Sequence, residues 1–160
     1  RNWSKNIGNY TGLEISPEIC EALEALSHLL PPIFGNLPPR LSTPLLRDLA
    51  ATLDAHILTR VVLRGSFSEE GARQFAVDVR DGIWRGVFGR WGRKPEGLFR
   101  RLKDAMTLLT LPAADAPNTV GSLLEQLSVD DADTAVVALA EVGVHRLSPK
   151  EAVEVLQRRL

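Results

Sequence analysis

Apolar residues recur every three or four positions along most of this chain, which is the spacing of one face of an α-helix. The clearest row is Leu46, Leu49, Leu53, Ile57 and Val61. Two further rows are Ala72, Phe75, Ala76, Val79, Ile83 and Val87, and Leu98, Phe99, Leu102, Met106 and Leu109. The strand-like run at residues 60–63 is short and lies inside the first row. The pattern therefore predicts an all-α fold.

Serine, proline and glycine indicate where the helices of the first half begin and end. Ser16-Pro17 and Thr43-Pro44 each place a capping residue before a proline suited to the first helical position. The first helix should stop near Pro31-Pro32, because proline lacks a backbone N–H and cannot continue the hydrogen-bond pattern. Gly65 should end the second helix, and Ser68 should cap the third.

Proline and serine also indicate where the helices of the second half begin. Pro95 should begin a helix, and Pro112 to Asn118 forms a linker rich in alanine and proline. Three shorter helices should follow, at about residues 119–127, 129–142 and 149–159. The last opens with Ser148-Pro149-Lys150-Glu151, which is a capping box.

These elements predict a helical bundle of about six to seven helices. We expect one helical domain over residues 1–160, within which the linker would separate sub-bundles 1–111 and 118–160. With 44% hydrophobic and 24% charged residues, the composition is that of a folded globular protein. The net charge of −1 provides no general attraction to nucleic acid or acidic lipid. No apolar run approaches the roughly 20 residues that a membrane-spanning helix needs.

Residues for catalysis do not converge in this sequence. The single cysteine, Cys20, excludes an intrachain disulfide, and His28, His56 and His145 fall on three different predicted elements. Nucleophile elbows, phosphate-binding loops and dinucleotide fingerprints are all missing. The glycines of residues 82–89 do not follow a strand, so helix packing explains them better than a phosphate site. We therefore predict no catalytic, metal or cofactor-binding residue, and no cofactor.

Charge is unevenly distributed along the chain. Residues 85–103 carry seven basic residues and one acid, Glu96, whereas residues 104–141 contain no Lys or Arg. Two solvated faces are the simplest explanation. The functional interpretation is a basic patch that docks an acidic partner, since arginine beside aromatic residues is favoured at interfaces. Its candidate partner-binding residues are Arg85, Arg90, Trp91, Arg93, Lys94, Arg100, Arg101 and Lys103.

The most specific stretch runs from Leu53 to Leu111. It contains Phe-Ser-x-x-Gly-Ala-x-Gln-x-x-x-Asp from Phe67 to Asp78, then Pro-Glu-x-x-Phe from Pro95 to Phe99, then a leucine-rich helix. This order and spacing, with the tail Val142-Gly143-Val144-His145-Arg146-Leu147-Ser148-Pro149, resembles the C-terminal region of the Rint/Tip family of vesicle-tethering subunits. Before Leu41 only the helical character is similar.

The resemblance implies a non-catalytic domain that ends a helical-rod subunit of a multisubunit tethering complex (the Dsl/NRZ complex). Such subunits act in Golgi-to-ER retrograde transport and bind other tether subunits and ER SNARE proteins. The chain would then be cytoplasmic and peripheral to the endoplasmic reticulum membrane, reaching it through its partners.

The residues shared with the family have structural interpretations first. Phe67 is placed for a hydrophobic staple before Ser68. Gly71 would permit a neighbouring helix to approach closely, and Gln74 and Asp78 share one helix face. Pro95 would restart a helix that Phe99 anchors in the core.

Two alternatives stay open. A helical module that binds nucleic acid or acidic peptides would use the basic segment Arg85–Lys103, although no nucleic-acid-binding signature accompanies it. A small helical enzyme would need a polar pocket with perturbed titratable groups, for which the sequence offers no candidates.

Overall fold

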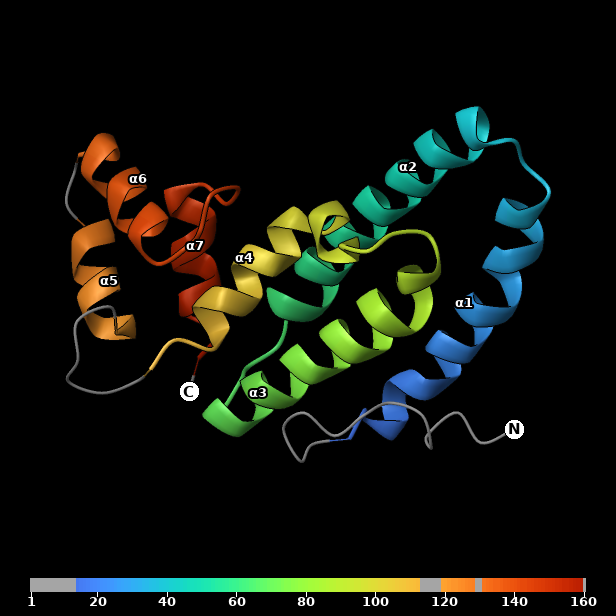
Figure 1. The fold of residues 1–160 in the computed structure, drawn as a ribbon. Coiled ribbons are helices and arrows are strands. Elements are labelled where there is room, and N and C mark those ends of the chain that lie inside the picture. The colour runs from blue at the N-terminus through green and yellow to red at the C-terminus, as the bar shows by residue number, and fades with distance from the viewer. Residues whose placement is uncertain (1–13, 113–118, 129–130, 160) are drawn as a thin grey trace. The chain divides into compact units, whose positions relative to one another are not determined.

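The computed structural model describes residues 14–112, 119–128 and 131–159, and most of these residues are helical (Figure 1). The all-α prediction is confirmed. Over the described ranges the only strand-like pairing is an isolated parallel bridge between Phe67 and Arg159. The part of the chain that the structure describes contains seven α-helices: α1 (Pro17–Gly35), α2 (Pro39–Ile57), α3 (Glu69–Val77), α4 (Arg100–Leu109), α5 (Val120–Leu127), α6 (Ala132–Glu141) and α7 (Pro149–Leu156).

Two helices continue as π-helix, in which each turn is wider than in an α-helix. The segment η2 (Leu58–Val62) prolongs α2, and η3 (Asp78–Val87) prolongs α3. Short 3-10 turns follow at η4 (Phe88–Arg90) and η5 (Pro95–Leu98). π-helical segments are rare and mostly single turns, so the ten residues of η3 are unusual. They carry Asp78, Asp81 and Gly82, all buried.

The chain forms two compact units. The first comprises residues 14–52 and 74–98, and the second comprises residues 53–73 with the described residues from 99 onward. Each unit is thus assembled from segments far apart in the sequence.

In the first unit α1 packs against η3 (Figure 1). Gly82 makes the contact close: a Cβ atom there would lie 2.7 Å from Cδ1 of the buried Leu23. At the other end of α1, the ring of Phe34 meets Trp91 with centroids 5.2 Å apart. Trp91 also contacts Phe88 edge-on at 6.3 Å. Both ends of α1 are therefore held by the segment that follows α3.

The first helix does not stop at Pro31-Pro32, so that prediction was wrong. It continues through both prolines to Gly35. Leu30 and Phe34 lie one turn apart and are both buried. Burying a large side chain such as Phe34 contributes roughly 2 kcal/mol, and this offsets part of the cost of prolines in the helix.

The second helix begins earlier than predicted. It starts at Pro39 rather than at Thr43-Pro44, so Pro44 lies inside it. Pro39 is the first residue of the helix, where the N–H that proline lacks would have no partner within the helix. The N–H groups of Leu41 and Ser42 both donate to the carbonyl of Pro38, which closes this first turn.

From its second member onward, the buried row of this helix is also displaced by one residue from the predicted one. Its members are Leu46, Ala50, Asp54, Leu58 and Val62, whereas Leu49, Leu53 and Ile57 are only partly buried and Val61 is 44% exposed. The spacing of four residues exceeds the 3.6 of an α-helix, which is consistent with the change to wider π turns at Leu58. A charged residue, Asp54, therefore occupies a core position.

The second unit is organised around α4, which packs against η2 and α7. Phe99, Leu102 and Leu108 have no exposed surface. Helices α5, α6 and α7 contact one another in pairs and lie side by side in Figure 1. The N–H of Phe67 donates to the carbonyl of Arg158 at 2.7 Å, which ties the segment before α3 to the end of α7.

The predicted helices of the C-terminal third are confirmed with adjusted limits. Helices α5, α6 and α7 correspond to the three expected segments, and α7 ends at Leu156 rather than Arg159. The capping box of Ser148 and Glu151 is present. Pro95 begins a 3-10 turn, and α4 itself starts at Arg100. The linker prediction falls mostly on residues 113–118, outside the described residues.

Close packing at Gly82 generates a stability prediction. Gly82→Val should lower the free energy of unfolding by about 1–3 kcal/mol, because the new side chain must displace buried Leu23. Gly121→Val is the matched control, since an added Cβ in α5 meets nothing within 4 Å. It should change stability by less than about 0.5 kcal/mol. Urea unfolding followed by circular dichroism measures both, and equal stabilities would show that Leu23 moves aside freely.

Candidate interaction site

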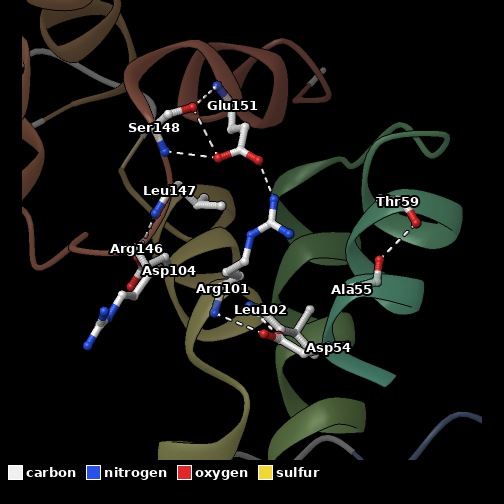
Figure 2. Close-up of polar contacts among 10 residues, drawn as sticks. All are labelled: Asp54, Ala55, Thr59, Arg101, Leu102, Asp104, Arg146, Leu147, Ser148 and Glu151. Carbon is white, nitrogen blue, oxygen red and sulfur yellow. Dashed lines mark hydrogen bonds and ion pairs between the residues drawn. The ribbon is translucent and has the colours of Figure 1, made fainter. Parts of the chain in front are cut away.

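A buried carboxylate, Asp54, caps the start of α4 (Figure 2). The N–H of Leu102 donates to Oδ1 at 2.7 Å, and the N–H of Arg101 donates to Oδ2 at 3.2 Å. The N-cap residue of α4 is Phe99, whose side chain cannot accept a hydrogen bond. Asp54 supplies from α2 the acceptor that α4 lacks, and its negative charge suits the positive end of the helix dipole.

Burial raises the pKa of the Asp54 carboxyl, while the N–H groups of Leu102 and Arg101 lower it. The net shift is upward, so the hydrogen bonds only partly offset the desolvation of the charge.

A second buried carboxylate, Asp104 on α4, holds the loop that leads to α7. Its Oδ2 accepts the backbone N–H groups of His145 at 2.9 Å, Leu147 at 3.2 Å and, between them, Arg146. Successive N–H groups directed at one oxygen form an anion-binding nest. The nest fixes the path of the chain just before Ser148.

The start of α7 closes this network. Oε2 of Glu151 accepts the N–H and the hydroxyl of Ser148, both at 3.0 Å, and the N–H of Glu151 donates to Oγ of Ser148 at 3.3 Å. The other carboxylate oxygen binds the guanidinium of Arg101. The backbone N–H of Ser148, followed by its hydroxyl and by Arg101, lowers the pKa of Glu151 against a smaller opposing effect of burial. Figure 2 shows α2, α4 and α7 joined through these side chains.

In the first unit, a buried aspartate likewise accepts a backbone N–H at the start of α1. Ser16 is the N-cap residue of α1, as predicted, but its side chain makes no capping hydrogen bond. Instead its backbone N–H donates to Oδ1 of the buried Asp78 at 2.7 Å. Nε2 of Gln74 donates to the same oxygen at 3.0 Å and to the carbonyl of Glu14 at 2.7 Å. Gln74 and Asp78 do share a helix face.

The candidate contact residues of the first unit differ in their surroundings. Nη1 of Arg85 donates to Oδ1 of the buried Asp81 at 3.0 Å, so Arg85 has a structural partner. Trp91 is partly buried against Phe34 and Phe88. The remaining three, Arg90, Arg93 and Lys94, are exposed.

In the second unit the candidates are Arg100, Arg101 and Lys103. Arg101 is only half-buried and is committed to Glu151. Arg100 and Lys103 are exposed on α4. The eight predicted residues are therefore divided between the two units.

Within the described ranges, no three His, Cys, Asp or Glu side chains are arranged to hold a metal ion. His28, His56, His145 and Cys20 are all exposed. Among the same residues, no helix is both long and apolar enough to cross a membrane.

Comparison with known proteins agrees with the family resemblance seen in the sequence. The RINT-1/TIP-1 family matches residues 1–159. The chain belongs to the RINT-1/TIP-1 family. A RINT1-like protein from Drosophila melanogaster is 34% identical over 147 residues, which are 91% of this chain and 20% of that protein. The chain therefore spans about a fifth of the length of this relative. No solved structure matches the chain.

Among the RINT-1/TIP-1-like residues, Phe99 is fully buried, and Pro95, which begins the 3-10 turn η5, is buried as well. Phe67 is partly buried and pairs through its backbone with the end of α7. Gly71 lies beside the cap of its own helix. Among the described residues, a Cβ atom added there would meet Oγ of Ser68 at 3.3 Å, and the N–H of Gly71 donates to that same oxygen.

Sequence reasoning missed the capping roles of Asp54 and Asp104. Both lie within the stretch that resembles the family, but an aspartate on a helix gives no sign of which remote N–H groups it will meet. The signal available was an acid within an apolar helical row, as at Asp54 beside Leu53.

Removing the Asp54 carboxylate should destabilise the protein markedly. Asp54→Ala leaves the N–H groups of Arg101 and Leu102 without their acceptor, at a cost of about 1–3 kcal/mol. Asp48→Ala, an exposed position on the same helix, is the control and should stay within about 0.5 kcal/mol. Chemical denaturation measures the difference in the free energy of unfolding. If Asp54→Ala is as stable as wild type, this capping interaction does not stabilise the protein.

Glu151 should give a pH-dependent contribution. Its folded-state pKa is lowered, so its stabilisation is present above the unfolded-state pKa and is lost as pH falls through the folded-state pKa. At pH 7 Glu151→Gln should be less stable than wild type by about 1 kcal/mol. Thermal unfolding from pH 7 down to about pH 3 should show this gap closing. A gap that does not change with pH would contradict the assignment.

Proposed function

We propose that this chain is a non-catalytic protein-interaction domain of a vesicle-tethering complex. On this proposal it acts in Golgi-to-ER transport, docks other tether subunits or ER SNARE proteins, and is held at the endoplasmic reticulum through them. The observation that carries the proposal is membership of the RINT-1/TIP-1 family over nearly the whole chain.

The distribution of polar groups supports a scaffold rather than a reaction centre. The buried carboxylates Asp54, Asp78 and Asp104 each bind backbone N–H groups, and Asp81 binds arginine side chains. Groups engaged in this way hold segments in place. A tether needs such stiffness, because it transmits position between its partners.

The exposed cations of the segment after η3 are the proposed contact residues. Arg90, Arg93 and Lys94 flank Trp91 in the sequence, and the ring of Trp91 packs against Phe34. A rigid aromatic residue among cations suits an acidic partner surface. Arg100 and Lys103 on α4 are proposed as secondary contacts in the second unit. Arg85 and Arg101 are proposed to stabilise the fold through their ion pairs with Asp81 and Glu151 rather than to contact the partner.

Calorimetric titration with recombinant tether subunits and the cytosolic regions of ER SNAREs tests the proposal. Saturable binding should persist at physiological salt, and the triple variant Arg90→Glu, Arg93→Glu, Lys94→Glu should weaken it at least tenfold. The control reverses Arg40, Arg47 and Arg64, which are equally exposed and change the net charge by the same amount. It should leave the affinity within about twofold.

Two results would contradict the proposal. Absence of binding to every tether subunit and SNARE would remove the tethering role from this domain. Binding to single-stranded RNA or DNA with a steep loss of affinity in salt would instead favour the nucleic-acid alternative, because phosphate contacts release counterions.

A further inference from the structure

Helix α6 is apolar on two sides. Ala135, Ala138 and Leu139 face the interior and are 5% exposed or less. Val136 and Val137 point outward with 55% and 57% of their surface exposed. Valine is a poor choice for a solvated helix position, because its branched side chain loses rotamer freedom and adds no hydrogen bond. A helix that is apolar on both sides is typical of one covered on both sides.

The exposed residues form a continuous stripe. Asp133, Val136, Val137, Ala140 and Glu141 are spaced three or four apart, so they follow one face of α6, and all five are exposed. An acid therefore lies at each end of an apolar centre. The ten residues of α6 extend about 15 Å, which matches two to three turns of another helix.

The charged residues of α5 and α6 all have one sign. Residues 104–141 contain no Lys or Arg, and the exposed acids on or next to α5 and α6 include Glu125, Asp131, Asp133 and Glu141. The hydroxyl of Thr134 lowers the pKa of Asp131, which keeps that carboxylate ionised. Nucleic acid, an anionic membrane and a second copy of the same face would all bring negative charge against negative charge.

We propose that the outer face of α6 docks one amphipathic helix of a partner protein, a helix whose apolar stripe is flanked by Lys and Arg. Val136, Val137 and Ala140 would contact the partner's apolar side chains, and Asp133 and Glu141 would face its cations. An amphipathic partner helix would pack on this face as in helix-in-groove recognition, but on a shallow surface. Because the contact is shallow, the dissociation constant should be on the order of micromolar. The inference rests on the proposed function in taking the partner from the tethering machinery, but the residues of α6 alone define the surface.

A synthetic peptide tests the docking surface on α6 separately from the tethering role. The probe is an 18-residue helical peptide with leucine at heptad a and d positions and lysine at the flanking positions; its control replaces every lysine by glutamate. Titration into the isotope-labelled chain should shift amide resonances of α6 with the lysine peptide and not with the glutamate peptide. No binding of the lysine peptide at millimolar concentration, or shifts confined to other helices, would overturn the inference.

Variants provide the second test. Val136→Lys with Val137→Lys should weaken binding of the lysine peptide at least tenfold, whereas Val61→Lys, an exposed valine of η2, should not. Asp133→Lys with Glu141→Lys should weaken it about fivefold, mostly through slower association at low salt. Glu21→Lys with Asp48→Lys is the control of equal charge. If both α6 variants bind the lysine peptide with the affinity of wild type, the proposal is wrong.

The same variants, tested against tether subunits and SNAREs, distinguish the failures. If those proteins bind wild type and both α6 variants equally, the α6 site is wrong and the tethering role stands. If none of them binds while the peptide still docks on α6, the surface stands and its partner lies outside the tethering machinery.

Discussion

The structure depends on buried aspartates that accept backbone N–H groups from distant parts of the chain. Asp78 does this for the start of α1 in the first unit, and Asp54 and Asp104 do it for α4 and the loop before α7 in the second. An ionised carboxylate in a core is costly unless its oxygens are satisfied. The arrangement is therefore specific, because each aspartate is tolerated only when the correct segment lies against it.

This requirement explains how short helices are held in place. Helices of eight to ten residues such as α4, α6 and α7 are too short to be stable alone in water. They gain stability from caps and from packing. In the second unit, Asp54 starts α4, Asp104 on α4 orders residues 145–147, and Glu151 then starts α7 and binds Arg101. One chain of charge-assisted hydrogen bonds thus links three segments.

In this domain the buried aspartates are occupied by structural hydrogen bonds, and the charged residues available to a partner lie on the surface. The surface carries the basic residues Arg90, Arg93 and Lys94 in the first unit and the acidic, apolar face of α6 in the second. The two surfaces suit partners of opposite charge. This division is consistent with the proposed interaction role.

The sequence by itself determined the fold class, the family and most helix positions, because helical periodicity, caps and motif order are local properties. The capping box at Ser148 and the shared face of Gln74 and Asp78 could be predicted for the same reason. Only tertiary structure decided that Pro31 and Pro32 lie within a helix and that the buried row of α2 passes through Asp54. Packing against remote segments overrides local preference in each case, and no spacing rule specifies which remote segment arrives.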